Sequence, residues 1–349
     1  MSNNGNLWPP AGAPFTHADA SVGKVMMQVQ IASILPLLVH IYYFGWGIAV
    51  QWMLAMMTGL VVEYAMLHLR GRPVKPFLLD GSAVITVTGL TFCIPPESPW
   101  WLIVVGVSFA LIFGKHLYGG LGYNPFNPAM LGYAFLLVSF PAEMTQWTLP
   151  SAVSGHTLSI MDSMIKIFTG HLPQGLIDQV TGATPLDHVK TGLHNGGTVH
   201  DVLSHSQTIW NGIAGHGWIQ VNIAFMLGGL YLLWTRTIRW QYPVGFLGTL
   251  ALLAWIFHTI DPAHYAPPLF HLLSGGTMLA AFFIITDPVT AAATPKGRLI
   301  YAMGIGVLVY VIRTWGGYPD GIAFAVLLMN IFVPLIDQYT QPRVKGYSK

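Results

Sequence analysis

Long apolar runs separated by short polar turns make up most of this chain of 349 residues. Each run is close to the ~20 residues that an α-helix needs to cross the hydrocarbon core of a bilayer. Ten runs can be placed, at about 24–44, 46–68, 78–96, 99–118, 126–141, 217–235, 243–260, 268–286, 299–314 and 320–337. The pattern predicts an all-α integral membrane protein with about ten transmembrane helices.

The longest polar interval, residues 142–216, divides the runs into two groups of five. Long loops of this kind are usually functional. Because the first 23 residues are polar and contain three prolines, no cleaved signal peptide is expected. The predicted organisation is an N-terminal tail at 1–23, five helices over 24–141, an insert at 142–216, five helices over 217–338 and a C-terminal tail at 339–349.

Composition supports the membrane interpretation. Charged residues are 8% and apolar residues 53% of the sequence, whereas about a quarter of the residues in soluble domains are charged. The formal net charge of +2 indicates no class of partner by itself, and no nucleic-acid partner is expected. The one cysteine, Cys93, lies in an apolar run, which excludes a disulfide framework and a thiolate-ligated iron–sulfur cluster held by this chain alone.

Lysine and arginine fix the orientation, because the cytoplasmic loops of membrane proteins carry an excess of both. With the N-terminus inside, twelve fall on the cytoplasmic side: Lys24, Arg70, Arg72, Lys75, Lys115, Arg236, Arg239, Lys296, Arg298, Arg343, Lys345 and Lys349. Three fall outside: Lys166, Lys190 and Arg313. We therefore expect both termini in the cytoplasm and residues 142–216 on the periplasmic side.

The two groups of runs contain similar turns. Lys115 and a Gly-Gly-containing turn at 119–125 precede the fifth run, and Arg313 and a Gly-Gly-Tyr-Pro turn at 316–319 precede the tenth. Each group has an odd number of helices, so a duplication would be inverted in the membrane, with binding sites between the halves. Asparagine caps in the segment 124–127 mark a helix start whose free N–H groups favour a phosphate or an electron-rich ring.

Three carboxylates in or beside the apolar runs are candidates for an ion path, because a charge at membrane depth is costly and needs a partner. They are Glu63, two turns before Arg70, Asp80 after a basic cluster, and Asp287 before Lys296. Asp80 and Asp287 also fit a structural role, as a helix cap or in a salt bridge near a helix end, whereas Glu63 sits deeper in its run.

The fourteen histidines form no recognisable metal site. No His-x-x-x-His pair lies beside a carboxylate in a zinc-site arrangement, and there is no Cys-x-x-Cys-His haem signature. No metal ion is therefore expected. Phosphate-binding Gly-x-x-x-x-Gly-Lys and Rossmann fingerprints are also absent, so no recognisable soluble module binds ATP or NAD(P)H.

The insert contains one stretch that suggests chemistry, at residues 178–187. Small residues at 181–183 allow a close approach of the backbone to a ligand. Thr184 follows with a hydroxyl that could be held for chemistry, and Pro185 fixes the chain just after it. Taken alone, such a stretch is usually a loop turn.

Four blocks carry a resemblance that covers nearly the whole chain: GGLGYNPFNPAM at 119–130, HLLSGGTM at 271–278, TDPVT at 286–290 and GGYPDG at 316–321. Together they resemble the family that contains the D subunit of bacterial Rnf electron-transport complexes and the B subunit of the sodium-pumping NADH:quinone reductase. In that family an Asp-x-x-(Ser/Thr)-Gly-Ala-Thr segment receives FMN as a phosphoester on its last threonine, attached by a flavin transferase.

The matching positions here are Asp178, Thr181, Gly182, Ala183 and Thr184. The resemblance implies covalent FMN on Thr184, which would be an attachment point and not a catalytic nucleophile. Asp178 and Thr181 would then be recognition elements for the transferase, and no catalytic residue is expected in this chain.

The resemblance also implies a role and partners. The chain would be a subunit, not active alone, of a translocase in the bacterial inner membrane. That complex would pass electrons between ferredoxin and NAD⁺, coupled to Na⁺ or H⁺ movement. The partners would be subunits of the A, B, C, E and G types, the flavin transferase and the lipid bilayer. A second, non-covalent flavin such as riboflavin is carried by related subunits, although no local motif here marks it.

Two other functions stay open on the sequence. A quinone-reductase B-type subunit would differ in its partner subunits and electron acceptor. A solute channel or transporter is suggested by the five-plus-five inverted repeat, an architecture shared with urea and ammonium channels. The tethering motif argues against a plain transporter, because a channel has no use for a covalent electron carrier.

Overall fold

The computed structural model describes residues 21–172, 180–205 and 213–342. These residues are mainly helical, and the strands among them are the two-residue pair β1 (Trp147–Thr148) and β2 (Thr181–Gly182). The strands run antiparallel, with Trp147 opposite Gly182. The chain is an all-α integral membrane protein.

The first half contains α1 (Val22–Phe44), α2 (Gly47–Leu69), α3 (Val74–Leu78), α4 (Ser82–Thr91), α5 (Trp100–Leu111), a π-helical turn η1 (Ile112–His116) and α6 (Pro128–Ser139). The second half contains α13 (Trp218–Trp234), α14 (Gln241–Ile260), α15 (Pro268–Leu273), α16 (Thr277–Leu279), a π-helical turn η2 (Ala280–Ile284), α17 (Pro295–Trp315) and α18 (Ile322–Tyr339). Between them lie α7 (Pro141–Thr145), β1, α8 (Ser151–Ser154), α9 (Ile160–Thr169), β2, α11 (Pro185–His194) and α12 (Val199–His205).

Five helices in the described part of the chain, α1, α2, α14, α17 and α18, are long and apolar enough to cross a membrane. The helices α5 with η1, α6 and α13 are apolar but shorter. Large apolar side chains such as Met57, Val61 and Trp255 are more than half exposed on the spanning helices. In lipid this exposure costs little, because the acyl chains are as apolar as the side chains.

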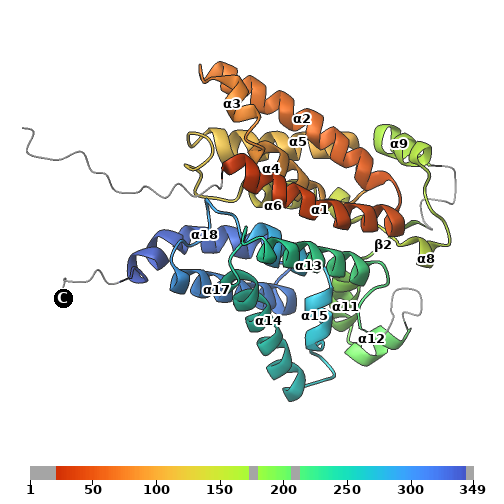
Figure 1. Ribbon diagram of the computed structural model, residues 1–349. Helices are drawn as coiled ribbons and strands as arrows, with labels where there is room; N and C mark the ends of the chain where they lie inside the picture. The colour runs from red at the N-terminus through yellow and green to blue at the C-terminus, as the bar shows by residue number, and fades with distance from the viewer. Residues whose placement is uncertain (1–20, 173–179, 206–212, 343–349) are drawn as a thin grey trace, which may run out of the picture.

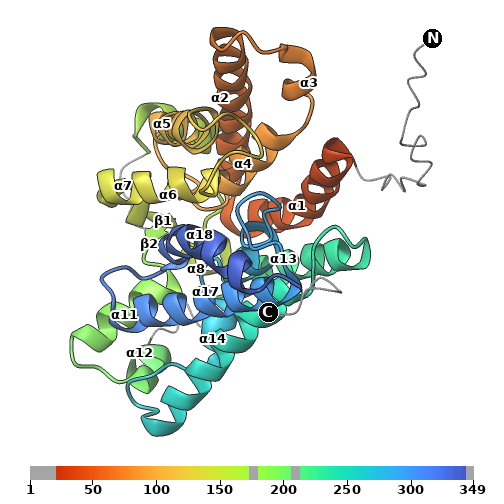
Figure 2. The ribbon, with the colours of Figure 1, turned by 90° about the vertical axis from the view of Figure 1, so that its left-hand side faces the viewer.

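The two halves lie side by side, and equivalent helices form their interface. In Figures 1 and 2, α2, α4, α5 and α6 lie above and α14 and α17 below, with α1, α13 and α18 between them. The first helices of the halves, α1 and α13, pack together, and so do the fifth helices, α6 and α18. An inverted repeat would pair equivalent helices of the two halves in this way, and the repeat itself stays a prediction.

Glycines allow close approach at this interface. A Cβ on Gly228 of α13 would lie 2.5 Å from the carbonyl oxygen of Ala32 in α1, and one on Gly229 would lie 2.1 Å from Cγ of Phe282. Small residues are the usual means by which membrane helices bring their backbones together. Helix α13 is thereby held between the first half and η2.

The third apolar run of each half departs from the continuous helices expected over 78–96 and 268–286: the first is helical only over Ser82–Thr91, after a break at its start, and the second is broken between Leu273 and Thr277. The breaks contain Gly81, with φ at +79°, and Gly275, with φ at +58°. Glycine adopts this left-handed conformation readily, and it commonly ends a helix. The helix after the first break ends at Thr91, shortly before a turn rich in proline.

Each break is followed by a buried hydroxyl that receives a hydrogen bond from a cation of the fourth run. Nζ of Lys115 donates to Oγ of Ser82 at 2.9 Å, and Nη2 of Arg313 donates to Oγ1 of Thr277 at 2.9 Å. Lys115 and Arg313 are themselves buried, so both breaks in the helices are held by charged groups that are shielded from solvent.

Candidate functional site

Thr184 caps the start of α11. Its Oγ1 accepts a hydrogen bond from the backbone N–H of Asp187 at 3.2 Å, and Pro185 occupies the first helical position. Threonine favours this position because its oxygen satisfies one of the N–H groups left free at a helix start, and proline at the first position loses no hydrogen bond. The hydroxyl therefore lies at the positive end of a helix, where a phosphate is favoured.

The residues before Thr184 are held by strand pairing. Thr181 and Gly182 form β2, and a Cβ on Gly182 would lie 2.7 Å from a methyl group of Leu149. A larger residue at 182 would therefore displace the Leu149 side chain. Ala183 is half-buried in the link to α11. Asp178 lies outside the described residues.

A cavity of about 330 Å³ opens beside Thr184, between the insert and both halves. Its aromatic lining residues are Phe92, Tyr133, Trp147, Trp218, Phe225 and Tyr318. A volume of this size and a mainly apolar wall with few polar groups are typical of small-molecule sites. Flat aromatic faces of this kind suit a planar ring system.

The polar lining of this cavity includes His40, Asp187 and Asp320. His40 is only 4% exposed, and its Nδ1 has no hydrogen-bond partner among the described residues. Its ring stacks on Phe44 with centroids 4.6 Å apart. A buried polar atom without a partner is costly, so His40 fits a wall that a polar ligand completes.

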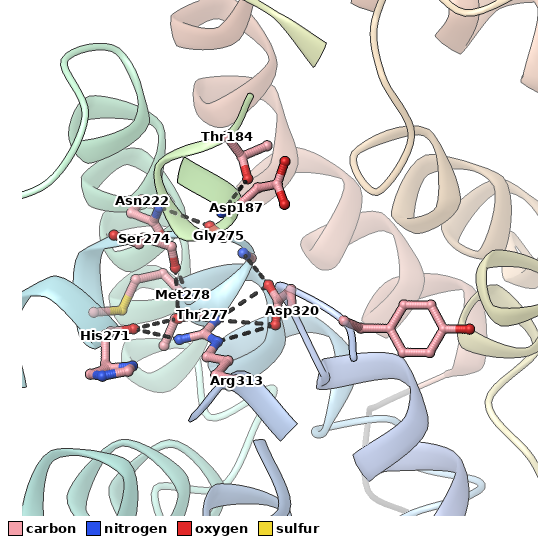
Figure 3. A network of polar contacts seen from close by, with 12 residues as sticks. Thr184, Asp187, Asn222, His271, Ser274, Gly275, Thr277, Met278, Arg313 and Asp320 are labelled. Carbon is pink, nitrogen blue, oxygen red and sulfur yellow. Dashed lines mark hydrogen bonds and ion pairs between the residues drawn. The ribbon is translucent and has the colours of Figure 1, made fainter. Parts of the chain in front are cut away.

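Asp320 is held in place by a buried network, shown in Figure 3. The guanidinium of Arg313 donates to both carboxylate oxygens of Asp320 at 3.2 Å and to the carbonyl oxygen of His271 at 2.8 Å. The carboxylate also accepts the backbone N–H of Gly276 at 3.1 Å. The charge of Arg313 is thus matched inside the protein, and the break between α15 and α16 is clamped to the start of α18.

Asn222 of α13 satisfies the other backbone groups at this break (Figure 3). Its Nδ2 donates to the carbonyl oxygens of Leu273 and Gly275 at 3.1 and 3.0 Å, and its Oδ1 accepts from the N–H of Met278 at 3.2 Å. A Cβ on Gly275 would lie 2.5 Å from both Asp320 and Leu186. The first turn of α11 therefore packs directly on the break.

Lys190, in the middle of α11, ties this helix to the second half. Its Nζ donates to the carbonyl oxygens of Ile312, Arg313 and Tyr318 at 3.2, 3.2 and 2.7 Å. An ammonium is well placed there, because the end of a helix carries negative partial charge and unpaired carbonyls. The helix that begins at Thr184 is thus fixed to the loop that carries Asp320.

The three carboxylates considered for an ion path all have partners. Glu63 is 1% exposed and accepts from Nζ of Lys115 at 2.7 Å, and its second oxygen pairs with Nε2 of His116 at 2.9 Å. Asp80 accepts from the backbone and hydroxyl of Ser82. Asp287 caps the turn that follows it, accepting from the Val289 N–H and the Thr290 hydroxyl. Asp80 and Asp287 thus have the capping role that the sequence left open, and Glu63 is held in a buried ion pair. None of the three lines the Thr184 cavity.

A second cavity, of about 120 Å³, also lies between the halves. Its polar lining includes Ser82, Lys115, Asn124, Asn127 and Asp287. The Oδ1 of Asn124 is buried and has no partner among the described residues. Three apolar residues, Phe92, Leu279 and Ile284, line both cavities. They form an apolar layer between the two.

Several residues of the site were not singled out from the sequence: His40, Trp147, Lys190, Trp218 and Asp320. Asp320 lies in the 316–321 block and Gly275 in the 271–278 block, so the blocks held a signal for those two. The partners of Lys190 are backbone carbonyls more than a hundred positions away, which no local pattern indicates. Within the described residues, no group of three or more His, Cys, Asp or Glu side chains could hold a metal ion.

Comparison with known proteins gives a consistent result. The model of the NQR2, RnfD, RnfE family matches residues 10–346. A protein of Erwinia tasmaniensis, named as the D subunit of an ion-translocating oxidoreductase complex, is 49% identical over 348 residues, which cover 97% of this chain and 98% of that protein. Proteins of the same name from Aeromonas hydrophila and Sodalis glossinidius are 50% and 49% identical over 345 residues, with 96% and 97% of this chain and 98% of each protein covered.

Proposed function

The chain belongs to the NQR2, RnfD, RnfE family, and from this we propose that it is the membrane subunit of an Rnf-type complex and carries FMN covalently on Thr184. The complex passes electrons between ferredoxin and NAD⁺ and couples their flow to Na⁺ or H⁺ translocation. The subunit acts with partners of the A, B, C, E and G types in the bacterial inner membrane and is not active alone. Both of its termini are cytoplasmic, and residues 142–216 are periplasmic.

One observation carries the proposal. The hydroxyl of Thr184 lies at a helix start on the edge of a cavity with aromatic walls. A phosphoester on Oγ1 leaves that oxygen able to accept from the Asp187 N–H, so the cap survives attachment. A tethered flavin would supply one- or two-electron transfer. The chain's own residues would hold its ring between aromatic side chains, offer it the unpaired Nδ1 of His40, and shield it from water.

The second cavity, at about 120 Å³, is smaller than the ~300 Å³ at which small-molecule sites usually begin, so a second, non-covalent flavin such as riboflavin stays a prediction. The cavity lies between the halves, where inverted-repeat proteins place their ligands. Asn124 presents a buried oxygen without a partner there, and Asn127 caps α6 through a bond to the Met130 N–H at 3.2 Å. These amides would hold the polar edge of a ring, beside the Lys115–Glu63 pair.

The relatives' names favour a D-type subunit over the quinone-reductase B-type subunit, which belongs to the same family. A channel is less well supported, because the apolar layer of Phe92, Leu279 and Ile284 separates the two cavities and a polar solute would have to cross it.

Replacing Thr184 with alanine tests the tether. The chain expressed with a flavin transferase should show fluorescence in a denaturing gel and an added mass of one FMN moiety, and Thr184→Ala should lose both. The matched control is Thr198→Ala, because the Thr198 hydroxyl accepts from the Asp201 N–H at 3.1 Å and so caps α12 in the same way. That variant should keep its flavin.

Wild-type chain without flavin, despite an active transferase, would contradict the tether and bring the channel interpretation forward. Loss of flavin in both threonine variants would show that capping of the insert matters, and not the Thr184 hydroxyl itself.

A further inference from the structure

Helix α9 of the insert has three different faces. At about 100° per residue, five large apolar side chains fall on an arc of roughly 140°, and they are 43–63% exposed. These residues are Ile160, Met161, Met164, Ile165 and Phe168. Ser163 and Ile167 form the buried face, while Asp162, Lys166 and Thr169 form the polar face. Such separation of apolar and polar arcs is typical of helices that lie in a membrane interface.

The buried face fixes α9 to the first half. The hydroxyl of Ser163 donates to Oε1 of Glu97, in the turn between α4 and α5, at 2.7 Å. Ile167 is 1% exposed, and α9 packs on α2. The helix begins with a capping box between Ser159 and Asp162 and ends at Gly170, with φ at +76°. Its orientation is therefore set, and the apolar arc must point away from the protein.

The neighbours of α9 place it where the bilayer ends. The carbonyl oxygen of Leu158, just before α9, lies against Gly45 in the turn that joins the spanning helices α1 and α2. In Figure 1, α9 lies at the end of the molecule where α8 and β2 also lie. Exposed aromatic residues stand at the same helix ends, namely Tyr42, Trp46 and Trp100. Exposed aromatic side chains of this kind mark the level of the lipid headgroups.

The surface of the spanning helix next to α9 is apolar and exposed. Helix α2, on which α9 packs, exposes Met53, Met57 and Val61 by 47%, 58% and 67% along its length. The apolar arc of α9 is likewise exposed and contains no charged side chain. Placed in water, it would be an exposed apolar patch on a helix of only ten residues.

We propose that α9 is an interfacial helix whose apolar arc is buried in the outer leaflet of the lipid bilayer. Its occupant is lipid acyl chain and not a partner protein. The anchor bears on the attachment segment, because Leu158 and Leu172, on either side of α9, pack in one cluster with Val180, directly before β2. Seating α9 in the bilayer thus fixes the height at which the segment before Thr184 leaves the membrane surface.

Spin labels test this assignment in the assembled complex, reconstituted in lipid nanodiscs. With the native Cys93 replaced by alanine, single cysteines are introduced as Met164→Cys and Phe168→Cys on the apolar arc. Thr169→Cys, one residue further along on the polar face, is the matched control. Collision of each label is measured with oxygen, which concentrates in acyl chains, and with a neutral nickel chelate, which stays in water.

At Met164→Cys and Phe168→Cys, collisions with oxygen should exceed those with the chelate, and Thr169→Cys should show the reverse. A chelate rate at the apolar arc as high as at Thr169→Cys would place that arc in water and overturn the proposal. Low rates with both reagents at the apolar arc would show that protein covers it, which would overturn the proposal equally.

Discussion

Glu97 is a buried carboxyl whose charge has little compensation. It is 5% exposed, accepts one hydrogen bond from Ser163, and its Oε2 has no partner among the described residues. Burial raises its pKa above the ordinary 4.5, although the Ser163 hydroxyl and the charge of Lys166 oppose this in part. Between 4.5 and the raised value, the folded state binds more protons than the unfolded state, so stability falls as pH rises.

Glu97→Gln should therefore raise the unfolding temperature at neutral pH, because the amide removes a buried charge and can still accept from Ser163. The gain should shrink as the pH is lowered towards 4.5, where Glu97 is neutral in the folded protein. Thermal unfolding in nanodiscs between pH 4.5 and 8 measures this, with the half-exposed Glu143→Gln as control. An equal gain at every pH would show that ionisation of Glu97 is not the cause.

Glu63 presents the opposite case, a buried carboxylate with two partners. Glu63→Gln leaves the buried Lys115 without its counter-charge and should cost about 3–5 kcal/mol of stability. The double variant Glu63→Gln, Lys115→Met should recover part of that loss, because it removes the unpaired cation. Unfolding in denaturant compares the stability of the two variants. A smaller loss of stability in the single variant than in the double variant would contradict the pairing.

The same variants bear on ion movement. It remains a hypothesis that Glu63, Asp80 or Asp287 takes part in ion movement, motivated by their place in or beside membrane helices. Neutralising each in a complex that still assembles, with ion transport unchanged in proteoliposomes, would remove that hypothesis and leave the capping and pairing roles described above.

Among the elements, α11 links the attachment threonine to the second half through Lys190. Lys190→Met should leave FMN attached to Thr184, because the attachment motif is untouched, but should loosen the helix that carries it. We expect lower flavin fluorescence anisotropy and stronger quenching by iodide. Lys166→Met, on α9, is the control and should change neither. Unchanged anisotropy in Lys190→Met would mean that packing of Leu186 on Gly275 holds α11 by itself.

The sequence predicts most of the helices seen in the structure. It fails where the backbone conformation of a single glycine breaks a helix. Apolar length predicted α1, α2, α14, α17 and α18 closely, because spanning helices need that length. It could not predict the two interrupted runs, since Gly81 and Gly275 look like ordinary glycines until their positive φ is seen. The Thr-Pro-x-Asp pattern at 184–187 does contain the cap of α11, yet nothing local predicts the Arg313–Asp320 clamp beneath it.

For the whole molecule, the distribution of lysine and arginine predicts which side faces which compartment. A membrane-impermeant maleimide should label His200→Cys, exposed on α12 of the insert, in intact spheroplasts. It should label Arg72→Cys, exposed between α2 and α3, only after the membrane is opened. Labelling in the reverse pattern would invert the topology and place Thr184 in the cytoplasm.

The apolar layer of Phe92, Leu279 and Ile284 has a consequence for energy conservation. Hydrocarbon is a very poor conductor of ions, since a charge within it is costly, whereas an electron can tunnel across a gap a few side chains thick. With a flavin on either side, such a layer would act as an insulator for ions and a junction for electrons. The membrane would then keep its potential while electrons pass between the cofactors, because ions could not leak through the subunit that carries them.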